Sequence, residues 1–112
     1  MRSVDQGLAT ELAAMAAEDQ RIRAVPDDGS FGHRMTTEEV IAWRRVSVGN
    51  TDRLRVIVAE HGWPGRALVG EQGAEDAWLL AQHADHQLDS QRLFLAALQE
   101  AADALRRRAA VS

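Results

Sequence analysis

The chain has 112 residues, enough for one domain with one modest hydrophobic core. Its formal net charge of −4 gives no electrostatic reason to expect nucleic-acid binding, and no apolar run approaches the roughly 20 residues that cross a bilayer. Cysteine and lysine are absent, which excludes disulfides, thiolate metal sites and lysine Schiff bases. The N-terminus leads into an acidic amphipathic segment rather than an apolar signal core, so we expect a cytoplasmic protein.

The first predicted helix covers residues 5–24. Apolar side chains recur at helical spacing from Leu8 onward, with alanine and glutamate at most of the other positions. The same spacing includes Asp19, which places a carboxylate on the side of the helix that would be buried. Pro26 ends this helix, and the segment 25–35 is either a slack loop or a cover over an opening between helices.

The second predicted helix covers residues 37–60. Thr36 and Glu39 have the spacing of a capping box, which is typical of a helix N-terminus. Asn50 interrupts an otherwise apolar stripe on this helix, as Asp19 does on the first. The glycine-rich segment 62–70 then predicts a break before the next helix.

Two further helices are predicted, over residues 72–85 and 88–109. The last of them has the most regular apolar stripe, which repeats every three or four residues and leaves homodimerisation open. The stripe consists of Leu88, Gln91, Leu95, Leu98, Ala102 and Leu105.

Four helices with mostly short connections predict an all-α fold, a single-domain antiparallel four-helix bundle. Each helix carries a polar residue on the stripe that it would bury. These residues are Asp19, Asn50, His83 or Asp85, and Gln91. Each would cost about 1–3 kcal/mol if buried without a partner, so we expect them to meet in one polar site near one end of the bundle. The alternative is a buried network that only fixes how the helices align.

His83 is the candidate general acid or base, because histidine titrates near neutral pH. Asp19 or Asp85 would orient its imidazole, which makes these three the predicted catalytic residues. Asn50 and Gln91 carry amides suited to holding a carbonyl, amide or carboxyl group of a substrate.

The predicted pocket is walled by two tryptophans, Trp63 and Trp78, and its substrate-binding set is completed by Gln82 and Arg23. His83 and His86 stand three residues apart, with Asp85 and Asp89 nearby, so two or three metal ligands could converge. No His-Glu-x-x-His motif is present, so neither a metal nor a cofactor is expected.

The sequence resembles a family of small bacterial domains of unknown function that is common in actinobacteria. The resemblance rests on Asp19-Gln20-Arg21-Ile22-Arg23, Asn50, Gly62-Trp63-Pro64, Val69-Gly70, Ala77-Trp78-Leu79-Leu80-Ala81-Gln82-His83-Ala84-Asp85 and Gln91. The residues that carry the resemblance include the polar residues selected by helical periodicity, but the family has no established activity to transfer. The chain departs from it at Gln87-Leu88, where many relatives have Asp-Pro.

These patterns lead to a hypothesis of a cofactor-independent enzyme that performs acid–base chemistry on a small polar metabolite. The reaction would be an elimination, isomerisation, cyclisation or hydrolysis, and the resemblance suggests a role in specialised metabolism. The alternative is a non-catalytic helical module that binds a small ligand or a partner protein.

Overall fold

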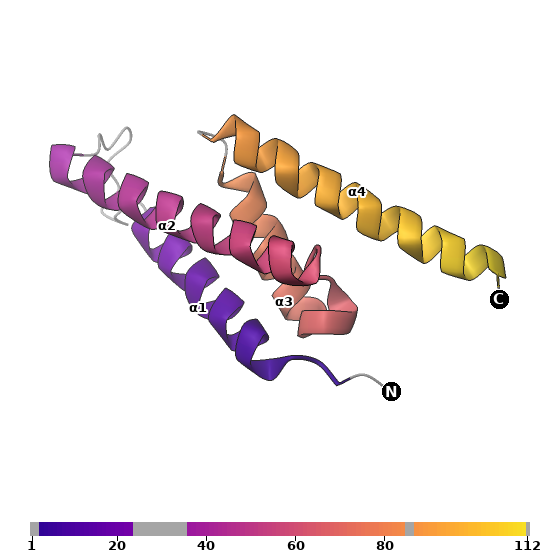
Figure 1. Ribbon diagram of the computed structural model, residues 1–112. Helices are drawn as coiled ribbons and strands as arrows, with labels where there is room; N and C mark the ends of the chain where they lie inside the picture. The colour runs from indigo at the N-terminus through magenta and orange to yellow at the C-terminus, as the bar shows by residue number, and fades with distance from the viewer. Residues whose placement is uncertain (1–2, 24–35, 85–86, 112) are drawn as a thin grey trace, which may run out of the picture.

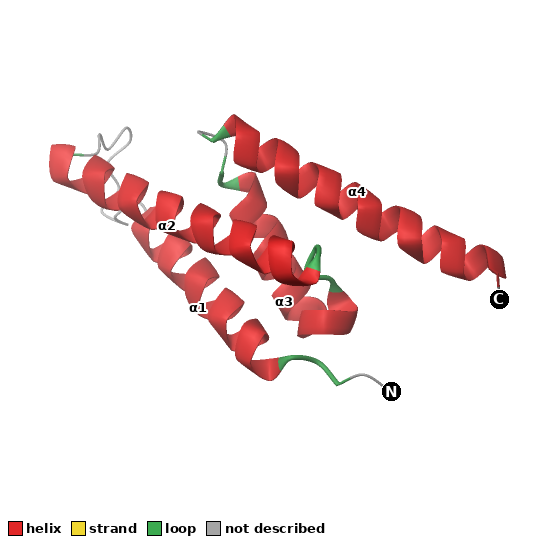
Figure 2. Cartoon of the chain, in the orientation of Figure 1, coloured by secondary structure: helices red, strands yellow, loops and turns green. Residues whose placement is uncertain are grey.

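Four helices and no strand make up the described part of the chain in this computed structural model, which confirms the all-α prediction (Figures 1 and 2). The structure describes residues 3–23, 36–84 and 87–111. The helices are α1 (Gln6–Arg23), α2 (Thr37–His61), α3 (Arg66–Gln82) and α4 (Leu88–Val111). Among these residues, no helix has the length and apolar character that a bilayer crossing requires.

Side chains and backbone groups outside the helices hold the starts of α1 and α2. The Asp5 carboxylate accepts a hydrogen bond from the backbone N–H of Leu8 at 3.0 Å, so it satisfies one of the unpaired donors of the first turn. The backbone N–H of Asp5 donates to the carbonyl of Leu68 at 2.7 Å, which ties the start of α1 to the start of α3. The predicted capping box at the start of α2 is present, with Thr36 and Glu39 each bonded to the other's backbone N–H.

The third helix begins at Arg66, earlier than the predicted start at residue 72. Residues 66–69 form a helical turn of their own, and Gly70 joins this turn to the rest of α3. Gly70 has φ 78° and ψ 174°, a backbone conformation that is essentially restricted to glycine, and it kinks the helix. The sequence predicted a connection over residues 62–70. The structure instead has a short helical turn over residues 66–69 of this segment.

The core lies where α1 packs along α3 and both are covered by α2. Asp5 contacts α3 at one end of α1, and Asp19 contacts His83 at the other end, so α1 and α3 run in the same direction. Helices that follow each other in sequence run antiparallel, as the contacts of Asn50 with Met15 and of Arg53 with Glu11 show for α1 and α2 (Figure 1). The buried apolar residues are Leu8, Leu12, Ala16, Leu54, Ile57, Val69, Ala77, Leu80, Ala81, Ala84 and Phe94.

The last helix packs on the rest of the bundle through only part of its length. The described chain measures 55 × 27 × 23 Å, and α4 extends beyond the other helices at its C-terminal end (Figure 1). Its buried residues are Ser90 and Phe94, whereas Leu95 and Leu105 are 52% and 64% exposed. The expectation that α4 buries its regular leucine stripe is therefore wrong, because much of that stripe faces outward.

Candidate functional site

A buried carboxylate meets a histidine where α1 and α3 end. Asp19 comes from the penultimate turn of α1, and its side chain is 3% exposed. His83 follows the last residue of α3, and its side chain is 28% exposed. Nδ1 of His83 donates a hydrogen bond to Oδ2 of Asp19. Because an ionised carboxylate can only accept, the bond places the imidazole proton on Nδ1 and leaves Nε2 as the second ring nitrogen for other contacts.

Arg23 completes this pair from the last turn of α1. Its Nε donates to Oδ1 of Asp19 at 3.2 Å, and its Nη2 donates to the backbone carbonyl of His83 at 3.3 Å. The guanidinium lies 5.1 Å from the ring centre of Trp43 on α2, within the range of a cation–π contact. The buried carboxylate thus has a cationic partner as well as the imidazole, which compensates for the loss of its hydration.

The backbone carbonyl of His83 is available because the last carbonyls of a helix have no partner within the helix. The chain leaves the helical conformation here, with φ −79° and ψ 2° at His83. Ser47 of α2 donates its hydroxyl to the same carbonyl at 3.4 Å. Side chains from α1 and α2 therefore satisfy one orphan carbonyl of α3. We call the group formed by Asp19, Arg23, Ser47 and His83 the His83 cluster.

Asn50 lies near this cluster but bonds elsewhere. Its Nδ2 donates to the carbonyl of Met15 on α1 at 3.4 Å. The predicted role of Asn50 was to hold a substrate, whereas in the structure its side-chain donor fastens α2 to α1.

Gln91 satisfies other carbonyls at the end of α3. Its Nε2 donates to the backbone carbonyls of Ala81 and Gln82, each at 3.4 Å. Gln91 and Gln82 line a small groove of about 140 Å³ between α3 and α4, together with Trp78. They therefore face α4 rather than the His83 cluster.

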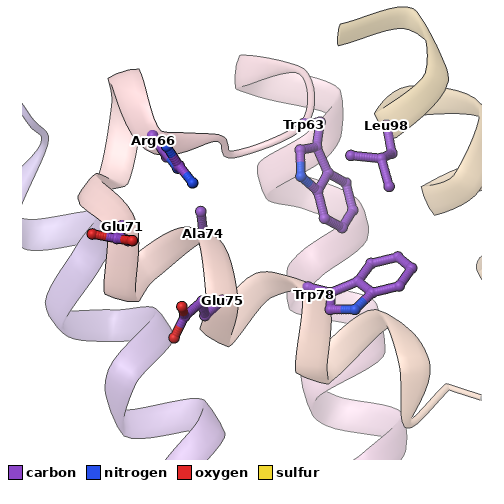
Figure 3. Close-up of a pocket in the computed structure, with 7 residues that line it drawn as sticks. All are labelled: Trp63, Arg66, Glu71, Ala74, Glu75, Trp78 and Leu98. Atoms are coloured by element: carbon purple, nitrogen blue, oxygen red, sulfur yellow. The ribbon is translucent and has the colours of Figure 1, made fainter. Parts of the chain in front are cut away.

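A larger groove of about 330 Å³ continues along α3 and contains both predicted tryptophans (Figure 3). The indoles of Trp63 and Trp78 project into the same opening, and Leu98 of α4 lies beside them. Trp63 meets Phe94 edge-on, with ring centres 6.5 Å apart and an angle of 61° between the rings. Trp78 is 41% exposed although it sits in an apolar groove. We call this opening the tryptophan groove.

The structure thus divides the predicted site residues between two places. His83, Asp19 and Arg23 lie together in the His83 cluster, and Trp63, Trp78, Gln82 and Gln91 line the space between α3 and α4. Asp85 and the predicted loop 25–35 fall outside the described residues, as does His86. Among the residues that are described, no three histidine or carboxylate side chains form a group able to hold a metal ion.

Ser47 of the cluster and Trp43, which contacts Arg23, were not predicted as site residues, although a signal for them exists. Ser47 lies one turn and Trp43 two turns before Asn50 on the same helical stripe. A stripe that carries a tryptophan, a serine and an asparagine in successive turns is unusual for a purely apolar core.

Comparison with known proteins places the chain in a family. Residues 6–109 match the model of a Family of unknown function (DUF6624), and the chain belongs to this family. No curated protein and no solved structure matches it. The family agrees with the resemblance noted in the sequence and brings no assigned activity.

Proposed function

We propose that this member of a family without an assigned activity is a small enzyme that moves a proton at His83, without a bound cofactor. The substrate would be a small polar metabolite, and the reaction an elimination, isomerisation, cyclisation or hydrolysis. A role in bacterial specialised metabolism belongs to the same proposal. The observation that carries it is the hydrogen bond between Nδ1 of His83 and the buried carboxylate of Asp19.

This bond suits His83 to act as a base through its other nitrogen. With the proton held on Nδ1, the lone pair of a neutral imidazole lies on Nε2. Within the described ranges no side chain bonds Nε2, and the imidazole is partly exposed. Asp19 would fix the orientation of the ring and stabilise the imidazolium that forms when Nε2 takes a proton, which is the role of the carboxylate in catalytic triads. Asp19 is therefore a positioning residue, and His83 the catalytic one.

The charge beside the imidazole favours a substrate with a carboxylate or a carbonyl oxygen. A guanidinium has five N–H donors, and the bonds to Asp19 and to the His83 carbonyl use one from Nε and one from Nη2 of Arg23. The Arg23 side chain is 27% exposed, and no described residue accepts from its remaining donors, which would bind a small anionic or polar group. Such a group held by Arg23 would bring its acidic C–H or its leaving group to the imidazole.

The competing interpretation is that the cluster only fixes the alignment of α1, α2 and α3. A network with that role alone has no need of an accessible imidazole. Asp19 is buried, as both interpretations require, but His83 is more than a quarter exposed. This difference in exposure between the two partners supports the catalytic interpretation.

The proposal can be tested without knowing the substrate. A panel of small carboxylic and carbonyl metabolites in D₂O would be followed by proton NMR, which detects both exchange of acidic C–H groups and new products. We expect turnover of at least one compound, and a loss of about 10²–10⁴-fold in rate for His83→Gln. Gln82→Ala is the matched control, because the neighbouring Gln82 side chain faces α4 and should not affect the rate.

Circular dichroism decides whether the loss has a catalytic cause. If His83→Gln stays folded and keeps the wild-type rate, the proposal is wrong. If the substitution unfolds the protein, the cluster is structural and the proposal also fails.

A further inference from the structure

We call residues 99–111, at the projecting C-terminal end of α4, the outer part of this helix (Figure 1). None of residues 99–110 is buried, and Leu105 in their midst is 64% exposed. Residues 99–111 span about 20 Å at 1.5 Å per residue. An isolated helix of this length would be marginal in water, and the outer part of α4 carries an apolar stripe that continues from Leu98. Both properties indicate that another surface covers this part of α4.

The tryptophan groove provides a surface of matching length and chemistry. It continues into the smaller groove through Trp78, so an apolar channel follows α3 beyond its kink. Residues 71–82 of α3 span about 18 Å, close to the length of the outer part of α4. Arg66, Glu71 and Glu75 line the groove, so its charged side chains carry an excess of one negative charge; both glutamates are exposed, and neither forms an ion pair with a described residue (Figure 3).

The outer part of α4 carries three arginines that complement this excess negative charge, of which Arg106 also lies 3.3 Å from Asp103 of its own helix. Successive helical residues are turned by about 100°, so Arg106 and Arg108 flank Leu105 on its two sides while Arg107 points the opposite way. A helix that placed Leu105 in an apolar groove would therefore direct Arg106 and Arg108 to the edges of that groove.

We propose that the occupant of the tryptophan groove is α4 of a second copy of this chain, in a two-fold symmetric dimer. The outer part of each α4 lies along α3 of the other copy, with Leu105 against Trp78 and its flanking arginines near Glu71 and Glu75. Two-fold symmetry makes the contact reciprocal, so both exposed leucine stripes and both grooves are covered at once. The proposal concerns the α3–α4 side of the molecule and does not depend on the chemistry of the His83 cluster.

Sedimentation equilibrium over a range of concentrations tests the dimer directly. We expect the wild type to approach twice the chain mass of 12.3 kDa. Leu105→Glu should raise the dimer Kd by at least about 30-fold, because it places a charge in the centre of the interface. The matched control is Ile41→Glu on α2, because Ile41 is also an exposed apolar residue (52%, against 64% for Leu105) but lies on another helix, so its substitution should leave the Kd unchanged.

Reversal of charges tests which surfaces meet. The double substitution Glu71→Arg and Glu75→Arg gives a protein whose groove is basic and repels α4 of an identical copy. The double substitution Arg106→Glu and Arg108→Glu gives a protein whose α4 is acidic and is repelled by the groove of an identical copy. Each doubly substituted protein should be monomeric by itself. A mixture of the two should form a mixed dimer in native mass spectrometry, because both reciprocal contacts then join opposite charges. Arg107→Glu is the control, and it should remain dimeric.

Two outcomes would overturn the proposal. One is a wild-type protein that stays at the mass of a single chain up to its solubility limit, which would assign the groove to a different ligand or partner. The other is a dimer that survives Leu105→Glu, or a failure of the charge-reversed proteins to associate when mixed although circular dichroism shows both to be folded.

Discussion

Replacing Asp19 with asparagine removes the charge from the centre of the His83 cluster with almost no change in volume. The carboxylate accepts from Nε of Arg23 at 3.2 Å and from Nδ1 of His83. The asparagine oxygen can accept only one of these bonds without competition, and its amide nitrogen must donate. We expect the oxygen to keep Arg23, because a guanidinium can only donate, and the amide to turn toward His83.

The cost in stability follows from what the two partners lose. A hydrogen bond to a charged group contributes about 1.5–3 kcal/mol and a neutral one about 0.5–1.5 kcal/mol. The side chains of Arg23 and His83 are 27% and 28% exposed, so water replaces part of the loss. We therefore expect Asp19→Asn to lower the free energy of unfolding by about 2 kcal/mol, which corresponds to about 10 °C in Tm for a domain of this size. A structure of typical stability, about 5–15 kcal/mol, remains folded after such a change.

The same substitution changes the tautomer of the imidazole. An amide that donates to Nδ1 of His83 requires a lone pair there, so the proton moves to Nε2. The nitrogen proposed to act as a base then carries a proton at the start of the reaction. The rate should fall by about 10³–10⁴-fold, as expected when a base is held in the wrong tautomer.

Urea denaturation and nitrogen NMR of the imidazole measure the two effects separately. Asp52→Asn is the control: Asp52 is an exposed carboxylate on α2, and its substitution should change the stability by less than about 0.5 kcal/mol. The reasoning is refuted if Asp19→Asn is as stable as the control, or if His83 carries its proton on Nε2 already in the wild type.

Three further predictions concern the scaffold. Arg53 donates to Glu11 and lowers the pKa of that carboxyl, so Glu11→Gln should destabilise the protein by less than about 1 kcal/mol, since 36% of the Glu11 side chain is exposed. The lowered pKa of the Glu11 carboxyl stabilises the fold fully above the ordinary value of 4.5 and progressively less below it. In urea titrations, the difference in stability between the wild type and Glu11→Gln should therefore shrink as the pH falls below 4.5 and vanish below the lowered pKa. Thr36→Ala removes the N-cap of α2 and should lower the free energy of unfolding by about 1 kcal/mol in the same titration. An equal loss of stability in the control Thr37→Ala would argue against capping as the cause. Gly70→Ala should cost about 1–3 kcal/mol through backbone strain alone, since an added Cβ meets nothing closer than 3.9 Å; an unchanged Tm would contradict the strained geometry.

Much of the fold follows from local patterns that the sequence carries openly. Periodicity places α1 and α2 within one residue of their observed ends, and the capping box marks the start of α2. Asp19 and His83 were selected because they break apolar stripes, and a buried polar group needs a partner. That requirement explains why two residues 64 positions apart in the chain are found bonded to each other.

Other features depend on information that periodicity does not contain. A stripe shows which side of a helix is apolar but not which side its neighbours cover, so the rotation of α4 that buries Phe94 and exposes Leu95 was not predictable. The kink at Gly70 was missed because a glycine-rich segment is equally typical of a loop. Gln91 was expected beside His83, since both border the same turn, but its amide instead bonds the carbonyls of Ala81 and Gln82 and lines the groove between α3 and α4.

The end of α3 has a consequence for the cooperativity of unfolding. The backbone carbonyls of its last residues bind Gln91 of α4, and the carbonyl of His83 binds Arg23 of α1 and Ser47 of α2. Fraying of this one turn would therefore release contacts to all three other helices together. Helix ends usually exchange their amide protons through local opening, but the amide of His83 should exchange only when the whole bundle unfolds.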